Sequence, residues 1–492
     1  MRRPRTALAT LLALSLTAAL ALGSTPAGAI SKTQRPTWWS KYRYLTSHPA
    51  LLTQSGSALR SATAPTVGPN VDVSNEKYPQ SETSIAIDPS SPSHLVAGSN
   101  EIYRLPMRSY HSSDSGASWS GVDLPLPPPI RKNGYDYGSD PSVAWDRHGN
   151  VYYSYIIVFF GAGYGVVGSE MAVARSSDDG KTWKATYFDF QTNEGTFVDK
   201  PMITVDNSST SPREGTIYVA FDHTGGNKRN AVFVASSTDG GRSFSAPKQA
   251  SQVTNGNNGG IGANPYVSPN GDVHVAWQDW VDSAVETSTS TDGGATWGRT
   301  VIIQPTAAAF ELALPSISSR AALLSPSCDT DISSGPYRGT LYCSWFDGSI
   351  SQGTDVLVSS SSDDGATWSE PLQVNHISTG DQYYQWLAVD PVTGDVDISW
   401  YDTRLDPSRR AVNVYFAFSS NGGASFSPNI RVSTASSNEE HGAKIDRGNQ
   451  YGDYEGLDAY GGVAHPVWTD NRSSLDPSLW EEVFTATVTV GQ

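Results

Sequence analysis

Polar side chains recur at one position along the chain, just ahead of a short apolar run. Glu82 precedes TSIAI, Asp140 precedes PSVAW and Lys200 precedes PMITV. Carboxylates gathered at one place could cleave a glycosidic bond, because one protonates the leaving oxygen while another acts as nucleophile or base. Crowding also raises the pKa of one carboxyl group, as an acid catalyst requires. The aligned series is Glu82, Asp140, Lys200 (after Asp199), Asn264, Leu314, Tyr384 and Tyr454 (between Asp453 and Glu455).

This series is compatible with a reaction and also with no reaction. In the reaction, two carboxylates would flank the scissile bond. Without a reaction, the ring would be a water-filled tunnel whose polar groups hydrogen-bond to one another. The candidate catalytic residues are Asp140, Glu82, Tyr454 and Glu455, and the candidate substrate contacts in the same series are Lys200 and Tyr384.

A second pattern ends in aspartate and, in two copies, in arginine. WYDTR and WTDNR end at Arg404 and Arg472. Each arginine could pair with the aspartate two residues earlier or clamp an anionic substrate, because guanidinium binds carboxylate through two hydrogen bonds. The tryptophans and tyrosines nearby suit stacking on sugar rings as well as packing. The recurring aspartates, for which a structural role is favoured, are Asp222, Asp279, Asp347, Asp402 and Asp470.

An octapeptide indicates the elements that position these groups. SSDDGATW at 361–368 follows the alternating run DVLVSS, which predicts a strand that leads into a tight turn. Its serine and aspartate can cap the amides of the turn, its glycine can take a positive φ, and its tryptophan can fold back as an apolar plug. These roles occupy the whole motif, so it is predicted to be structural. Near-copies stand at 112–119, 176–183, 237–244, 290–297 and 419–426.

The pattern S-x-D-x-G-x-[ST]-[WF] resembles the Asp-box, or BNR repeat, of the sialidase superfamily and of other secreted β-propellers. The resemblance implies that each box lies between the third and fourth strands of a blade, on the face opposite the active site. It also implies a tyrosine nucleophile activated by a glutamate, for which Tyr454 with Glu82 or Glu455 could serve, and an aspartate acid, for which Asp140 could serve. Finally, it implies a clamp of three arginines on a substrate carboxylate. YRLP at 103–106 is similar to the sialidase signature Phe/Tyr-Arg-Ile-Pro, which would make Arg104 the third candidate beside Arg404 and Arg472. Its place after a second strand differs from the family and favours a chance match.

The spacing of the boxes predicts the number of blades. They lie 53 to 71 residues apart, enough for four strands and their loops. After the sixth box come three further strand patterns and no box, and NVDVS at 70–74 is predicted to supply the missing strand. We therefore expect an all-β, seven-bladed β-propeller over 70–492 with six Asp-boxes, its last blade closed by an N-terminal strand, after a lead-in at 30–69.

The remaining features limit the surroundings and partners. Residues 1–29 resemble a signal peptide, with a basic start, an apolar core and a small-residue cleavage site, which predicts a secreted, extracellular protein. A net charge of −16 gives no general attraction to nucleic acid or to acidic membranes. In an oxidising compartment Cys328 and Cys343 are expected to pair and to staple a surface loop, which contributes about 3 kcal/mol.

No histidine spacing indicates a metal site, and His223 beside Asp222 is kept as a possible general base. No cofactor is expected, although acidic residues at one rim could bind Ca²⁺. The leading hypothesis is a monomeric, sialidase-like glycoside hydrolase acting on an extracellular glycan or glycoconjugate. The alternatives are a non-catalytic propeller that binds glycan or protein, and a polysaccharide lyase acting on a uronate-containing glycan.

Overall fold

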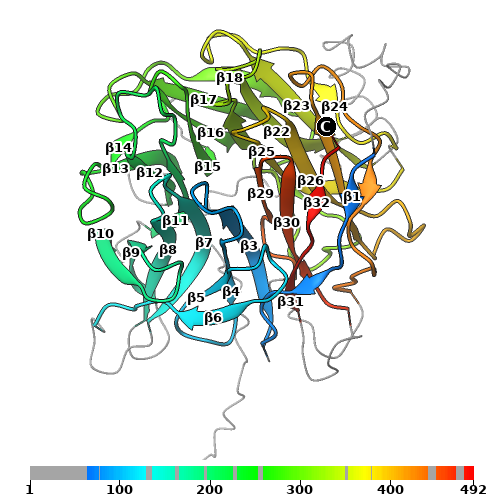
Figure 1. Cartoon of the computed structure of the whole chain (residues 1–492), viewed down its shortest axis with the longest axis horizontal. Helices are drawn as coiled ribbons and strands as arrows, with labels where there is room; N and C mark the ends of the chain where they lie inside the picture. The colour runs from blue at the N-terminus through cyan, green and yellow to red at the C-terminus, as the bar shows by residue number, and fades with distance from the viewer. Residues whose placement is uncertain are drawn as a thin grey trace, which may run out of the picture.

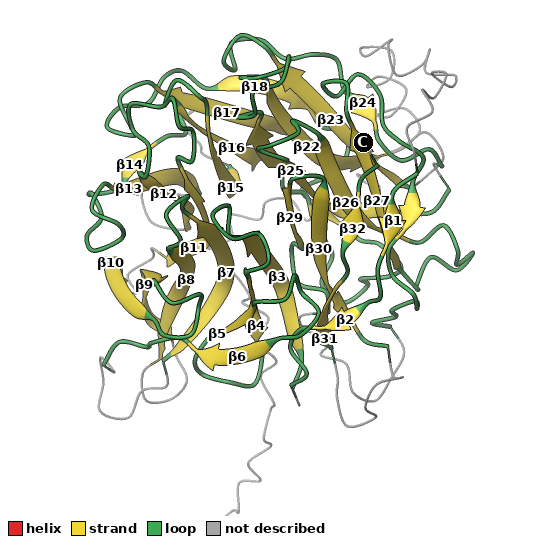
Figure 2. Ribbon diagram, in the orientation of Figure 1, coloured by secondary structure: helices red, strands yellow, loops and turns green. Residues whose placement is uncertain are grey.

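The computed structural model describes residues 64–76, 78–128, 136–160, 166–192, 197–224, 230–252, 259–348, 353–377, 379–440, 450–472 and 481–491. All regular elements in these ranges are β-strands. Seven antiparallel sheets stand around a common axis (Figures 1 and 2), and a separate two-stranded sheet lies within residues 311–323. The predicted seven-bladed β-propeller is therefore confirmed. The predicted signal peptide and most of the predicted lead-in lie outside the described residues. Within the described ranges, no helix is long and apolar enough to span a bilayer.

Six blades have four strands each, in chain order from the axis outward. Blade one is β3 (Gln80–Ile87), β4 (Leu95–Glu101), β5 (Arg108–Ser112) and β6 (Ser120–Asp123); blade two is β7 (Tyr137–Trp145), β8 (Val151–Phe160), β9 (Val166–Ser176) and β10 (Lys184–Thr192); blade three is β11 (Phe197–Val205), β12 (Ile217–Thr224), β13 (Ala231–Ser237) and β14 (Lys248–Gln249). Blade four is β15 (Gly260–Val267), β16 (Val273–Asp279), β17 (Ala284–Ser290) and β18 (Val301–Pro305); blade five is β21 (Ser327–Thr330), β22 (Leu341–Gly348), β23 (Thr354–Ser361) and β24 (Leu372–Gln373); blade six is β25 (Gln382–Val389), β26 (Val396–Asp402), β27 (Asn413–Ser419) and β28 (Ile430–Arg431).

Blade seven joins the two ends of the chain. Its strands are β29 (Gly456–Tyr460), β30 (Val463–Asp470), β31 (Glu482–Thr485) and β32 (Val488–Thr489), with β1 (Thr66–Val67) and β2 (Val71–Asp72) from the N-terminal side. Val71 lies opposite Thr485 in the β2–β31 pair, so the prediction that NVDVS closes the ring is confirmed. A second pair, β1 with β32, was not predicted, and Figure 1 shows the blue β1 beside the red β32. The described end of the lead-in therefore also belongs to this sheet.

The interior of the propeller consists of the interfaces between blades. The first strands contact one another around the axis, and apolar side chains fill the space between neighbouring sheets. The tryptophans that end the second strands, which include Trp345 and Trp468, are at most 1% exposed. Burial of such large rings stabilises a sheet-on-sheet interface by several kcal/mol in all. These aromatic residues therefore pack the blades and are not free to stack on a sugar.

The Asp-boxes have the geometry that their residue types predict. In the first box, the Ser112 hydroxyl accepts a hydrogen bond from the Gly116 amide at 3.0 Å and donates one to Asp114 at 2.8 Å. Asp114 accepts two bonds from Ser118, and Gly116 has φ of 80°. The Trp119 indole donates back to the Gly116 carbonyl at 3.0 Å. The motif is thus a closed turn between the third and fourth strands, with a structural role.

Cys328 and Cys343 form a disulfide, as predicted. Its position differs from the prediction, because the two residues lie opposite each other in the β21–β22 ladder and are at most 5% exposed. The disulfide therefore joins two strands inside blade five, and only the turn between them corresponds to a surface loop.

Candidate active site

A β-bulge near the start of the first strands positions the candidate residues. The register shifts within β3, β7, β11, β15 and β25, and the bulged residue has a left-handed backbone. Its φ is 54° at Glu82, 60° at Asp140 and 49° at both Lys200 and Tyr384. A bulge re-aims a side chain, and the left-handed region costs a non-glycine residue about 1 kcal/mol or more. The predicted equivalence of these four residues is confirmed.

Two members of the predicted series were aligned wrongly. In β15 the bulged residue is Gly262, with φ of 69°, and Asn264 lies two residues further on, where its side chain accepts a hydrogen bond from the Cys328 amide. Leu314 does not belong to a first strand. It lies in an inserted segment between β18 and β21 that contains the hairpin of β19 (Glu311–Leu312) and β20 (Ala322–Leu323). The apolar run of the insertion imitates a first strand, and β21 is the true one.

The inserted segment contributes an arginine to the axis. Arg320 donates two hydrogen bonds to Asp453, from Nε at 2.9 Å and from Nη2 at 2.6 Å, and Nη2 also lies 3.2 Å from Glu82 Oε1. The Lys200 ammonium forms an ion pair with the other oxygen of Asp453. These four residues, which come from blades one, three and seven and from the insertion, are called the axial cluster here. All except Arg320 are at most 6% exposed, whereas the Arg320 side chain is 25% exposed.

The two carboxyl groups of the axial cluster have opposite pKa shifts. Burial, reinforced by the charges of Asp453 and Asp140, raises the pKa of Glu82 to about 8, although Arg320 and Lys200 oppose the shift. Burial also acts on Asp453, but there Arg320 and Lys200 prevail and lower the pKa to about 2. At neutral pH the cluster therefore holds one protonated and one ionised carboxyl group.

Three further acidic residues, Asp140, Asp199 and Asp222, adjoin the axial cluster. Asn100 links Asp140 to the cluster, because the Asn100 amide donates to Glu82 and its carbonyl oxygen accepts the backbone N–H of Asp140 at 2.7 Å. Burial, with the charges of Asp140 and Asp222, raises the pKa of Asp199 well above its ordinary value. Burial likewise raises the pKa of Asp222 to about 8, and no described residue hydrogen-bonds to either of its carboxylate oxygens within normal geometry. The axis is thus rich in protonated carboxyl groups.

Tyr454 and Tyr384 lie beside the axial cluster, whereas Glu455 does not share it. The Tyr454 hydroxyl donates to the Pro141 carbonyl at 3.0 Å, and burial, followed by the charge of Glu82, raises its pKa well above the ordinary value. The Tyr384 hydroxyl donates to the Gly452 carbonyl at 2.7 Å. Glu455 instead accepts hydrogen bonds from Thr83 and from Tyr401 between blades six, seven and one.

The three predicted clamp arginines each have an acidic partner away from the axial cluster. Arg404 binds Asp402 and lies 4.1 Å from the ring centre of Tyr415. Arg472 binds Asp470 in the same way and lies 4.4 Å from the ring centre of Phe484. Arg104 binds Asp123 at 2.6 Å and lies 3.5 Å from Glu76. The structure does not bring the three together, and the arginine that reaches the axial carboxylates is Arg320. Their predicted role as substrate clamps stays a prediction.

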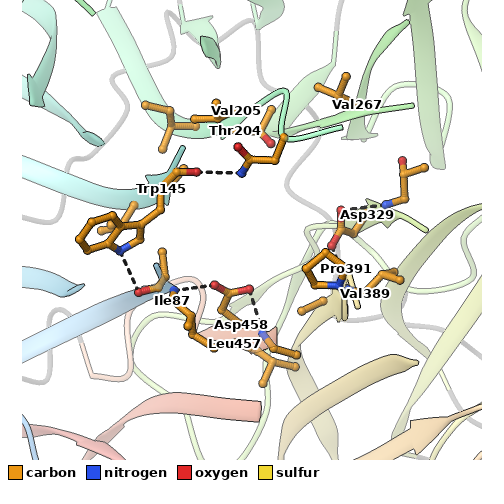
Figure 3. Close-up of a pocket in the computed structure, with 18 of the residues that line it drawn as sticks. Ile87, Trp145, Thr204, Val205, Val267, Asp329, Val389, Pro391, Leu457 and Asp458 are labelled. Carbon is orange, nitrogen blue, oxygen red and sulfur yellow. Dashed lines mark hydrogen bonds between the residues drawn. The ribbon is translucent and has the colours of Figure 1, made fainter. Parts of the chain in front are cut away.

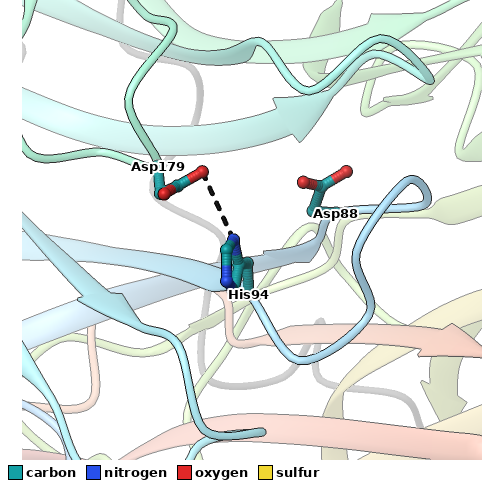
Figure 4. A group of neighbouring side chains, drawn as sticks. All are labelled: Asp88, His94 and Asp179. Atoms are coloured by element: carbon teal, nitrogen blue, oxygen red, sulfur yellow. Dashed lines mark ion pairs between the residues drawn. The ribbon is translucent and has the colours of Figure 1, made fainter.

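Two other candidates have local partners. His223, the possible general base, lies 2.7 Å from Asp189 and is 1% exposed. Asp88, His94 and Asp179 have ligand atoms within 4.8 Å of one another, and Figure 4 shows them between blades one and two. His94 Nδ1 lies 3.3 Å from Asp179, which also binds Lys181 at 3.0 Å. Because Lys181 already supplies a positive charge, this trio gives little reason to expect a metal ion.

The opposite end of the axis contains a cavity of about 450 Å³, lined by the far ends of the first strands (Figure 3). Its polar groups connect neighbouring blades. Asp458 accepts the Ile87 amide at 2.7 Å, Asp329 accepts the Val389 amide at 2.9 Å, and the Trp145 indole donates to a backbone carbonyl of β3. These polar groups already form hydrogen bonds that connect the blades. The axial cluster is therefore the stronger candidate for chemistry.

Little free space adjoins the axial cluster. The residues Tyr384, Asp453 and Tyr454, among others, line a cavity of about 10 Å³. This volume is about the space of one water molecule. Arg320 is the most exposed member of the cluster. A substrate that approaches Glu82 would therefore have to displace the Arg320 side chain.

Arg320 was missed by reasoning from the sequence. The gap of 71 residues between the fourth and fifth boxes is the longest of the five, and this was the one signal that blade five is preceded by extra chain. No local pattern shows that an arginine in this extra chain meets an aspartate 133 residues later.

The geometry defines the chain as a seven-bladed Asp-box β-propeller. In agreement, a family model described as a BNR repeat-like domain matches residues 146–325. No curated protein matches the sequence significantly.

Among solved structures, a Hadza microbial sialidase is similar at 17% identity and a TM-score of 0.48, over 67% of this chain and 66% of that one. The intramolecular trans-sialidase of Ruminococcus gnavus is similar at 13% identity and a TM-score of 0.45, over 70% and 94%. An α-L-arabinofuranosidase of Fusarium graminearum is similar at 13% identity and a TM-score of 0.46, over 72% and 98%.

Proposed function

We propose that the chain is a secreted glycoside hydrolase that acts on an extracellular glycan at the axial cluster. The observation that carries the proposal is the divided pair of carboxyl groups, Glu82 and Asp453, bridged by Arg320. Glycosidic hydrolysis needs one carboxylic acid that protonates the leaving oxygen and one carboxylate that attacks the sugar or activates water. With a pKa near 8 Glu82 suits the first role, and with a pKa near 2 Asp453 suits the second.

The surrounding residues keep the two groups in these states. Lys200 and Arg320 stabilise the negative charge of Asp453, so that it stays ionised although it is buried. Asn100 holds Glu82 against the backbone of Asp140, whose own carboxylate lies close enough to disfavour ionisation of Glu82. Tyr454 is less well suited to be the nucleophile, because its pKa is raised and its hydroxyl donates to a carbonyl.

Turnover of a mixed panel of sialylated, uronate-containing and neutral glycans tests the proposal. Products whose masses sum to substrate plus water support hydrolysis, whereas a sum equal to the substrate alone supports a lyase. The variant Glu82→Gln removes the proton donor with little change of shape and is expected to lower turnover by about 100-fold or more. The control Asp363→Asn lies in an Asp-box on the opposite face and should leave turnover unchanged. Equal turnover by Glu82→Gln and the parent protein would refute the role of Glu82.

A propeller that binds a glycan or a protein without reaction is the second candidate. It is favoured by the nearly closed packing of the axial cluster, where the cations Lys200 and Arg320 are matched by acidic partners and the adjoining cavity holds about one water molecule. Binding of a panel glycan without any product, with an affinity that Glu82→Gln does not change, would support this function instead.

A further inference from the structure

Three carboxylates gather at the end of blade four, apart from the axial cluster. Asp279 ends β16, Asp282 lies in the turn that follows, and Glu286 lies on β17 opposite Trp277. One carboxylate oxygen from each residue lies within 4.8 Å of the other two. Ca²⁺ binds oxygen ligands at about 2.3–2.6 Å, so two ligands of one ion lie at most about 5 Å apart. The three oxygens are therefore close enough to share one ion.

Glu286 is the buried carboxylate of this group whose negative charge no neighbouring group offsets within the described residues. Its side chain is 3% exposed, and within the described residues no lysine or arginine pairs with any of the three carboxylates. The indole N–H of Trp277 faces it but lies outside hydrogen-bonding geometry. A buried carboxylate without a partner is costly, since water no longer solvates it. Glu286 is thus a buried acidic group aimed at two further acids.

The backbone around Asp279 is arranged to hold its carboxylate in place. Its Oδ1 accepts the amides of Val281 at 2.8 Å and of Asp282 at 3.0 Å, and its Oδ2 accepts the Gly259 amide at 3.2 Å. A Cβ atom at Gly259 would lie 2.4 Å from Oδ1, so only a glycine at this position lets the backbone approach the carboxylate so closely. The turn therefore fixes one ligand of the three in place.

We propose that Asp279, Asp282 and Glu286 bind a divalent cation, with Ca²⁺ as the ion that fits best. The ligands are hard oxygen donors, and a turn of chain with one partly exposed aspartate suits the adaptable coordination of Ca²⁺ better than the strict octahedron of Mg²⁺. The bound ion would join the β16–β17 turn to the start of β15. This site is separate from the axial cluster and does not depend on the proposed hydrolysis.

Terbium luminescence tests the site directly, because Trp277 and Trp280 are near enough to sensitise a bound Tb³⁺ ion. The full secreted chain, freed of metal with a chelator, is expected to bind one Tb³⁺ that Ca²⁺ displaces. Glu286→Gln should weaken Ca²⁺ binding by about 10-fold or more, because a charged ligand is lost. The matched control Asp179→Asn alters the acidic trio of Figure 4 and should keep the parent affinity.

A second variant covers the case in which Glu286→Gln does not fold. Asp282 is partly exposed, so Asp282→Asn should fold and should also weaken binding. The proposal is overturned if the parent chain binds no Ca²⁺ up to about 5 mM, a concentration above the range of extracellular Ca²⁺ modules. It is equally overturned if Asp282→Asn binds as tightly as the parent, or if Asp179→Asn alone abolishes binding.

Discussion

Replacement of Glu82 by glutamine should change how the stability of the propeller depends on pH. In the unfolded chain this group has an ordinary pKa of 4.5, and in the folded chain burial next to Asp453 and Asp140 raises it to about 8. Between these values the folded state binds a proton that the unfolded state has released. The free energy of unfolding must therefore fall as pH rises, by about 1.4 kcal/mol for each pH unit.

The size of the effect follows from the shift. The contribution of the protonated Glu82 to the free energy of unfolding is fully present below pH 4.5. About 3 kcal/mol of it is lost by pH 7, and about 5 kcal/mol by pH 8. Glu82→Gln does not titrate, so it lacks this loss. It should weaken the contacts with Asn100 and Arg320 by about 1–2 kcal/mol at every pH. The variant is thus expected to be less stable than the parent at pH 4.5 and more stable at pH 8.

Urea unfolding of the parent chain and of Glu82→Gln from pH 4.5 to pH 8 measures this difference. Glu440→Gln is the control, because the hydrogen bonds from Ser318 and Gln450 outweigh burial and lower the pKa of Glu440. Its difference from the parent should stay flat over the same range. If the difference for Glu82→Gln were also flat, Glu82 would be ionised throughout, and its assignment as the acid would be wrong.

Substitutions at three further positions test the fold. Asp363→Ala should lower the free energy of unfolding by about 1 kcal/mol in thermal or urea unfolding, because the Asp363 carboxylate accepts hydrogen bonds from Thr367 and Ser361. Asp363→Asn should be nearly neutral, because Asn421 fills the same role in the sixth box. Equal losses of stability in the two variants would contradict this role. Lys200→Met should lower the free energy of unfolding by about 3 kcal/mol or more, because the buried Asp453 loses one of its two cations, and a loss below about 1 kcal/mol would show that the ion pair is not needed. Cys328→Ala should lower it by about 3 kcal/mol, the value for a loop of about 15 residues, and a parent chain that unfolds equally well with and without reductant would contradict the disulfide.

The features predicted correctly are those that short patterns determine. Each Asp-box forms its own turn from its own side chains, so the type and spacing of its residues were sufficient. The closing strand at Val71 was predicted because blade seven has three strand patterns and a sheet edge that needs a partner. The bulged positions at Glu82, Asp140 and Lys200 recur before apolar runs of equal length, which makes them alignable.

The features that were missed depend on contacts between distant parts of the chain. Leu314 was assigned to a first strand because an apolar run cannot by itself be told from an inserted segment that packs on the core. Arg404 and Arg472 were open to two roles from the sequence, and the folded structure pairs them with Asp402 and Asp470. Arg320 meets Glu82, which lies 238 positions away in the sequence, and Asp453, which lies 133 positions away, and the local sequence around each of the three residues is ordinary.

The central claim is that the axial cluster hydrolyses a glycosidic bond. The most direct test is to incubate the full chain, and in parallel Glu82→Gln, with the mixed glycan panel and to weigh the products by mass spectrometry. If the axial cluster hydrolyses the bond, the parent chain yields fragments that sum to substrate plus water, and the variant yields about 100-fold less product. Absence of any cleavage by the parent, or equal cleavage by both, would contradict it.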